Sequence, residues 1–286
     1  MLTVSSKIFR NRSYSTSVEA HHQDEISMKK VVGILVTGLF TLGTMPVLAA
    51  TKLVIAFEDK QQFPNYLGNS TEIDPAKPGI HVELVQMTAA EIGVELELVR
   101  QPWKRALDNL KKGEVDGVFS GSFSKDRMDI GVYPMAGDVP NEDLRIGTTS
   151  YSLYKAKGSP VGWDGKAVSG LAGSVSAPAG YSIVAELKKM NVPVEESPST
   201  AQDLTLLKAG RVEAVAAQEV TADQILKKPE FASVEKVSPP LVTKSYYLMF
   251  SHQSMAKDPE LVRKFWATLA KNRAAKADEL AAKYAE

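Results

Sequence analysis

The sequence predicts an α/β protein built as two lobes with a ligand cleft between them. Strand and helix patterns alternate in one block over residues 51–120, and again in a second block over about 152–239. The 236 residues that follow position 50 are enough for two compact lobes, because single cores usually stop growing near about 250 residues. Ligands of open α/β sheets bind beyond the carboxyl ends of the strands, so the loops at those ends are the expected site.

The first block is expected to alternate β-α-β-α-β, an order that favours a parallel sheet covered by helices. β-Branched and aromatic residues predict its strands, and apolar residues at helical spacing predict its helices. Gly93 and Gly113 follow the two helical patterns, as is typical of helix ends. The expected strands are 53–57, 94–99 and 116–120, and the expected helices are 80–92 and 102–112.

The second block and the C-terminal segment follow the same logic. Helices are expected at 181–190, 200–208 and 220–227, with strands at 212–217 and 245–250. The Ala- and Lys-rich segment 258–284 predicts one or two closing helices.

The N-terminal segment predicts secretion. Residues 28–50 combine a short basic start, an apolar run and small residues before a cleavage point at Ala49 or Ala50, which is typical of a signal peptide for a Gram-negative periplasm. The alternatives are an uncleaved anchor or a buried helix, although the run is short for a membrane span. Residues 1–27 are polar and are interpreted as an upstream extension, or else as a disordered tail.

Composition excludes several functional classes. The whole chain has 34 basic and 34 acidic side chains, of which five basic and three acidic ones lie in the first 50 residues. The remaining 29 basic and 31 acidic side chains give residues 51–286 a net charge of about −2. This argues against nucleic acid or anionic membrane as a partner. The absence of Cys excludes disulfides, thiolate metal sites and Cys nucleophiles. No metal-ligand spacing occurs after residue 50, where His81 and His252 are the two histidines, so neither metal nor cofactor is expected.

The motifs of the first block resemble one known family. In their order and spacing they are similar to the extracellular solute-binding proteins of polar amino-acid importers, bacterial family 3, with weaker similarity continuing to the C-terminus. The matching segments are Gly79-Ile80-His81-Val82-Glu83-Leu84, Ala90-Glu91-Ile92-Gly93-Val94, Gly113-Glu114-Val115-Asp116 and Ser120-Gly121-Ser122-Phe123-Ser124-Lys125-Asp126-Arg127.

This resemblance implies the type II periplasmic binding protein fold, in which two hinge strands join the lobes. Lobe one is then expected at 51–147 plus 244–286, and lobe two at 148–243. It further implies a monomer, and not an enzyme, that closes around a small carboxylate-bearing ligand by hinge motion. The expected partner is the membrane permease of an ABC importer.

The resemblance assigns Arg127 to the ligand carboxylate, with Ser122 as its hydroxyl partner five residues earlier and Ser120 as a weaker candidate. A guanidinium fork pairs with a carboxylate through two charge-assisted hydrogen bonds. The alternative is a surface arginine paired with Asp126 or Asp129, an interaction that contributes about 0–1 kcal/mol.

Aromatic residues are expected to form the walls of the cleft. The resemblance aligns Trp103 with an aromatic that stacks on the ligand, and Phe63 and Tyr66 could supply the opposite wall. The alternative is that Trp103 is an ordinary core residue of an amphipathic helix.

Lobe two is expected to offer the start of a helix at Tyr181 and Ser182, where free N–H groups favour anions; the alternative is an ordinary glycine turn with a serine cap. Where amino-acid binders carry an Asp for the ligand ammonium, this sequence has Gln218, with Glu219 next to it. Either Glu219 takes that role, or Glu58 or Asp59 supplies the charge, or the ligand is not an α-amino acid.

Two other functions remain open from sequence. The closed protein could engage a membrane sensor instead of a permease. Alternatively, the fold could support a dehydratase of cyclic carboxylic acids, with Glu58, Glu219 and Lys244 recruited for acid–base chemistry.

Overall fold

The computed structural model describes residues 51–285. The expected upstream extension and signal peptide, at 1–27 and 28–50, lie outside these residues. Between residues 51 and 285, no helix is both long and apolar enough to cross a membrane.

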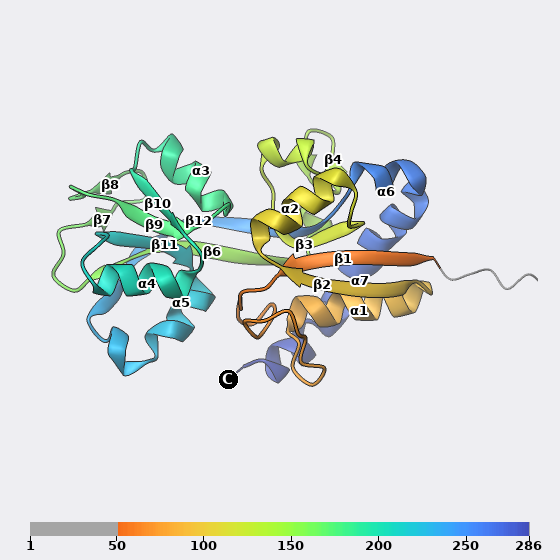
Figure 1. The fold of residues 1–286 in the computed structure, drawn as a ribbon, viewed down its shortest axis with the longest axis horizontal. Helices are drawn as coiled ribbons and strands as arrows, with labels where there is room; N and C mark the ends of the chain where they lie inside the picture. The colour runs from red at the N-terminus through yellow and green to blue at the C-terminus, as the bar shows by residue number, and fades with distance from the viewer. Residues whose placement is uncertain (1–50, 286) are drawn as a thin grey trace, which may run out of the picture. The chain divides into compact units, whose positions relative to one another are not determined.

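One eight-stranded mixed sheet runs through the described chain, in the order β10-β9-β11-β6-β12-β3-β1-β2 (Figure 1). Two small hairpins lie apart from it, β4 (Met135–Ala136) with β5 (Val139–Pro140) and β7 (Gly162–Trp163) with β8 (Val168–Ser169). The strands of the sheet are β1 (Lys52–Glu58), β2 (Glu95–Gln101), β3 (Gly117–Ser122), β6 (Gly147–Ala156), β9 (Val175–Pro178), β10 (Val194–Ser197), β11 (Ala214–Gln218) and β12 (Val234–Phe250).

Helices cover both faces of this sheet, as expected where parallel strands need cover on each side. The α-helices are α1 (Ile80–Ile92), α2 (Trp103–Lys112), α3 (Ser182–Lys189), α4 (Thr200–Lys208), α5 (Glu219–Leu226), α6 (His252–Lys257) and α7 (Pro259–Lys283). Three short 3₁₀ helices are η1 (Lys125–Asp129), η2 (Glu142–Leu144) and η3 (Pro229–Phe231).

Lobe one consists of β1, β2, β3 and the end of β12, with α1, α2, α6 and α7. β1 pairs in parallel with both β2 and β3, and β12 pairs antiparallel with β3. α1 packs on α7 on one face, while α2 packs on β1 and β3. The residues 246–250 of β12 alternate between the two resulting apolar clusters, because successive side chains of a strand point to opposite faces.

Lobe two consists of β9, β10 and β11 with α3, α4 and α5. β9 pairs in parallel with β10 and β11, and β6 closes this part of the sheet antiparallel to β11. Leu187 of α3 and Leu204 of α4 belong to different apolar clusters, so the helices cover opposite faces.

β6 and β12 are common to both lobes (Figure 1). β12 pairs with β6 along Val234–Tyr246 and then with β3 along Tyr246–Phe250. The two-lobed fold with two connecting strands is thus confirmed. The expected boundaries between the lobes, at 147/148 and 243/244, fall within β6 and β12. These exact boundaries stay a prediction.

Most elements agree with the sequence expectations to within one or two residues, and segment 258–284 forms the single long helix α7. Within the main sheet, β6, β9 and β10 were not predicted, nor were the four hairpin strands, and the expected strand 245–250 is only the last third of β12. The rest of β12 contains Pro239, Pro240 and Lys244, which obscure the pattern of a strand.

Gly79 fixes the loop 59–79 against the start of α1. Its backbone has φ +114°, and a Cβ there would lie 2.4 Å from Tyr66 Cα. Glycine alone permits this approach without a clash. The contact holds Tyr66 under the end of β1, where the candidate site begins.

Candidate functional site

Arg127 folds back onto the end of the strand that precedes it. β3 ends at Ser122, and η1 turns the chain so that Arg127 Nη1 donates to the carbonyl oxygen of Ser122 at 2.8 Å and to its Oγ at 3.1 Å. The Tyr133 hydroxyl donates to the same carbonyl at 2.8 Å. Arg127 is buried, with 7% of its surface exposed. The guanidinium is therefore held in one orientation before any ligand arrives.

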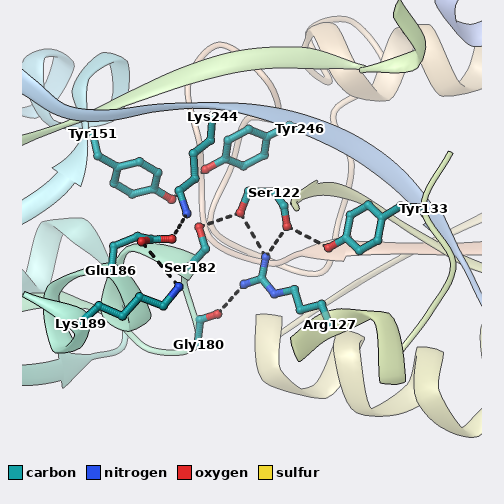
Figure 2. A network of polar contacts seen from close by, with 10 residues as sticks. All are labelled: Ser122, Arg127, Tyr133, Tyr151, Gly180, Ser182, Glu186, Lys189, Lys244 and Tyr246. Atoms are coloured by element: carbon teal, nitrogen blue, oxygen red, sulfur yellow. Dashed lines mark hydrogen bonds and ion pairs between the residues drawn. The ribbon is translucent and has the colours of Figure 1, made fainter. Parts of the chain in front are cut away.

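The same group reaches across to lobe two (Figure 2). Arg127 Nη2 donates to the carbonyl oxygen of Gly180 at 2.8 Å, and Ser122 Oγ donates to Ser182 Oγ at 2.7 Å. The indole Nε1 of Trp103 also donates to the Gly180 carbonyl at 3.3 Å, and the Arg127 Cζ lies 5.5 Å from the centre of the Trp103 ring. The start of α3 is thereby joined to lobe one by three hydrogen bonds.

Among residues 51–285, every polar contact of the Arg127 guanidinium is with a neutral oxygen. The alternative of a surface arginine paired with Asp126 or Asp129 is therefore wrong. A buried cation without a carboxylate is costly. It favours a carboxylate guest, which would supply the missing negative charge and the two acceptors that a guanidinium fork matches.

Glu58, at the end of β1, is the acidic side chain of the site. Its carboxylate accepts hydrogen bonds from the hydroxyls of Tyr66, at 3.0 Å, and of Tyr181 in lobe two. Burial raises the pKa of Glu58 to about 7, against the opposing effect of these two hydrogen bonds. Glu58 thus exchanges a proton near neutral pH, or ionises fully beside a cationic guest.

Two tyrosines from the shared strands line the same space. Tyr151 of β6 and Tyr246 of β12 share a hydrogen bond of 2.7 Å between their hydroxyls. Gln218 Nε2 donates to both, at 2.8 Å to Tyr246 and 3.3 Å to Tyr151. Gln218, where the resemblance to amino-acid binders leads one to expect an acid, is a neutral amide that is already hydrogen-bonded.

These groups line a space of about 220 Å³ between the lobes, part of it open to solvent, here called the interlobe cavity. It brings together nine of the eleven residues expected from sequence, and adds Gln62, Tyr151 and Tyr246. The lining residues are Glu58, Gln62, Tyr66, Trp103, Ser120, Ser122, Arg127, Tyr151, Tyr181, Ser182, Gln218 and Tyr246.

Two expected residues do not reach this cavity. Glu219 begins α5 and turns away: it accepts from Ser152 Oγ at 2.7 Å and lies 3.8 Å from Lys236 Nζ. It is therefore not placed to meet a guest in the cavity. Phe63 lines a neighbouring polar cleft instead, because the loop that carries it runs outward from β1.

Ser120 has its hydroxyl occupied within lobe one. Its Oγ lies 2.7 Å from Nδ1 of His81, a buried residue of α1. Burial lowers the pKa of His81 to about 3, so this imidazole is neutral at ordinary pH. Ser120 adopts φ +62°, an uncommon value for a residue other than glycine. His81 and Ser120 act together to shape the end of β3.

Ion pairs flank the cavity on the side of α3. Lys244 of β12 pairs with Glu186 at 2.9 Å, and Lys189 lies 3.8 Å from the same carboxylate (Figure 2). Lys104 of α2 reaches Glu196 of lobe two at 3.3 Å. The Lys244 and Lys104 pairs span the contact between lobe two and its neighbours, while the Lys189 pair lies within α3; none of the three lysines lines the cavity. Within residues 51–285, no cluster of three or more His, Asp or Glu residues could hold a metal ion.

The pKa of Glu58 generates a prediction for stability. Its native pKa of about 7 lies above the ordinary 4.5, so the folded protein retains a proton that the unfolded chain has lost. The contribution of Glu58 to the free energy of unfolding should therefore fall by about 3 kcal/mol as pH rises from 4.5 through 7. Glu58→Gln should remove this loss and be more stable than the wild type at pH 8, but not at pH 4.5.

Urea unfolding at the two pH values measures this difference. Two other groups leave a residual pH dependence in both proteins: Asp203, whose pKa burial raises to about 6, adds a slope of the same sign, and His81, whose pKa burial lowers to about 3, adds one of the opposite sign. Glu213→Gln, at a half-buried site where backbone hydrogen bonds lower the pKa, is the control and should show no gain at pH 8. An equal effect of Glu58→Gln at both pH values would contradict a raised pKa.

With the geometry established, comparison with known proteins is informative. Residues 55–129 match the sequence profile described as bacterial extracellular solute-binding proteins, family 3. This segment runs from β1 to η1 and contains both Glu58 and Arg127. A search of curated protein sequences gives no significant match.

Solved structures with the same fold are numerous, and three are representative. The GluR0 ligand-binding core from Nostoc punctiforme in complex with L-glutamate is 16% identical, with TM-score 0.63, over 81% of this chain and 98% of that one. A histidine kinase sensor domain similar to periplasmic binding proteins is 18% identical, with TM-score 0.66, over 82% and 96%. The substrate-binding protein AbpA from Streptococcus pneumoniae bound to L-arginine is 20% identical, with TM-score 0.60, over 80% and 90%.

The resemblance expected from the sequence is thus confirmed: residues 55–129 match the bacterial extracellular solute-binding proteins of family 3, and the described chain has the two-lobed type II binding-protein fold.

Proposed function

We propose that this protein is a periplasmic solute-binding protein that captures a small carboxylate-bearing solute between its lobes and delivers it to an ABC importer. The observation that carries the proposal is the buried Arg127 guanidinium, whose contacts within residues 51–285 are with neutral oxygens. A ligand carboxylate would take the place of the Gly180 contact and bridge Arg127 to Ser182 at the start of α3. The similar amino-acid-bound structures support this class of ligand.

Glu58 defines the second end of the solute. It is the acidic lining residue of the interlobe cavity, and Glu219 lies outside that cavity. An ammonium or another hydrogen-bond donor on the solute would therefore face Glu58 and the hydroxyls of Tyr66 and Tyr181. Such a group would also favour the ionised form of Glu58. The proposed ligand is an amino-acid-like solute whose amine is recognised from β1 instead of from β11.

Arg127→Ala should abolish most of the affinity for the carboxylate solute. Hydrogen bonds to charged groups contribute about 1.5–3 kcal/mol each, so loss of a two-point clamp should weaken binding at least about a hundredfold. Arg127→Lys keeps the charge but not the fork, and should recover only part of the loss. Calorimetry with a solute found by a thermal-shift screen of amino acids and organic acids measures both.

Arg105→Ala is the matched control, since Arg105 is an exposed arginine of α2 outside the cavity lining. It should bind like the wild type. A loss below about fivefold for Arg127→Ala, with an unchanged unfolding curve, would reject Arg127 as the anchor.

A membrane sensor is the second candidate partner, because one of the similar structures is a sensor domain. Both partners would recognise the same closed form. The dehydratase alternative is weaker: it needs a second acid–base group, yet Lys244 and Glu219 are both absent from the cavity lining and engaged in ion pairs.

Secretion is part of the proposal and rests on the sequence of residues 28–50. The exported protein should begin near Ala50 or Thr51. Its intact mass, measured on periplasmic extract, should match residues 50–286 or 51–286. A product that retains Met1 or Met28 would contradict a cleaved signal.

A further inference from the structure

The interlobe cavity opens toward a second, larger polar space, here called the outer cleft. The two share Gln62, Tyr181 and Gln218 as lining residues. Gln62 Nε2 donates to the Tyr181 hydroxyl at 3.3 Å, so a hydrogen bond between two side chains lies at their common boundary. The outer cleft holds about 930 Å³, part of it open to solvent, against about 220 Å³ inside.

The volumes of the interlobe cavity and the outer cleft determine how long a solute can be before it reaches the outer cleft. Ligand pockets usually hold about 300–1,000 Å³, whereas the interlobe cavity leaves about 10 Å³ for the centre of a water-sized molecule. A solute anchored at Arg127 that is longer than the cavity must extend past Gln62 and Tyr181 into the outer cleft. The chemistry of that cleft should therefore select the far end of the solute.

The lining of the outer cleft is rich in hydrogen-bond donors and contains no carboxylate. It includes two lysines, Lys60 and Lys228, and several amide side chains. Lys60 lies 3.6 Å from Asp59, which is not a lining residue. The interlobe cavity, in contrast, is lined by one group of each sign, Arg127 and Glu58. Asp59 offsets the charge of Lys60, so the far end of the solute meets Lys228 and amide side chains in a wall without a carboxylate.

Lobe two contributes two further features. The first turn of α4, at Thr200 and Ala201, lines the cleft, and the N-terminus of a helix favours negative charge. Independently, Thr221 of α5 lines the cleft with 8% of its surface exposed, and its Oγ1 has no hydrogen-bond partner within the described chain. A buried hydroxyl without a partner is uncommon, and a ligand acceptor would satisfy it.

We propose that the outer cleft is a second anion subsite of the same binding site, which takes a second acidic group at the far end of a carboxylate solute. The inference rests on the proposed function, since Arg127 anchors the first carboxylate. It narrows the solute class to molecules with two acid groups, whether two carboxylates or a carboxylate and a phosphonate.

Pairs of ligands that differ by the second acid group test this proposal. Calorimetry would compare glutarate with pentanoate, L-glutamate with L-glutamine, and 4-phosphonobutanoate as the phosphonate arm. In at least one pair the diacid should bind about tenfold more tightly than its partner, in keeping with one added charge-assisted contact. The phosphonate arm shows whether the subsite prefers that group to a carboxylate.

Variants then assign the effect to the outer cleft. Thr221→Val removes the hydroxyl at equal volume and Lys228→Gln removes a charge; each should lower the ratio of diacid to monoacid affinity severalfold. Thr221→Val should not lower the melting temperature, because its hydroxyl has no structural partner within residues 51–285. Lys227→Gln, one residue from Lys228 and exposed outside the lining, is the control and should leave the ratio unchanged.

The outcomes separate this inference from the proposed function. If monoacids bind as tightly as diacids, or if no diacid binds, the second subsite is overturned. The role of Arg127 as the anchor is tested separately, because Arg127→Ala should lose affinity for whichever acid the wild type binds, whether it has one acid group or two. A ratio that falls equally in Lys227→Gln and Lys228→Gln would also overturn the subsite, since it would reflect net charge alone.

Discussion

The arrangement of the site depends on the placement of one buried cation, the Arg127 guanidinium, at the contact between two lobes. Burying a charge is expensive, and it is tolerated where the group is hydrogen-bonded and a counter-charge can arrive. Ser122 and Gly180 accept these bonds from Arg127, and the Tyr133 hydroxyl donates to the same Ser122 carbonyl oxygen. Since Gly180 belongs to lobe two, the bond from Arg127 Nη2 is present only while the lobes are together.

The shared strands link this contact to the hinge. β6 and β12 carry Tyr151 and Tyr246 into the cavity, where their hydroxyls bond to each other and to Gln218. A change of twist in either strand would move a cavity wall at the same time as the lobes. Lys244 lies two residues before Tyr246 and pairs with Glu186 of α3. Opening and ligand release are therefore expected to occur in one motion.

Sequence could predict those parts of the site that depend on local signals. Arg127 and Ser122 are five residues apart, and Glu58 follows a clear apolar strand, so motif and pattern place them. Tyr151 and Tyr246 could not be found this way, because their positions depend on pairing between strands about ninety residues apart in sequence. These strands are rich in Thr, Ser and Lys, so they lack the apolar alternation that identifies a core strand.

Two adjacent residues at the end of β11 show a second limit of prediction from the sequence. Gln218 and Glu219 are neighbours, yet the strand-to-helix turn sends one into the cavity and the other to Ser152 and Lys236. Spacing alone could not choose between them. Phe63 and Tyr66 differ in the same way, since the loop that carries both is shaped by the close approach of Gly79 to Tyr66.

The central claim is that one carboxylate solute, held by Arg127, joins the two lobes. Small-angle X-ray scattering of the exported protein with and without a saturating solute tests it most directly. The account predicts that the radius of gyration falls in the wild type, as the hinge closes, and does not fall in Arg127→Ala at the same solute concentration. A solute that binds the wild type tightly while its radius of gyration stays unchanged would contradict the claim.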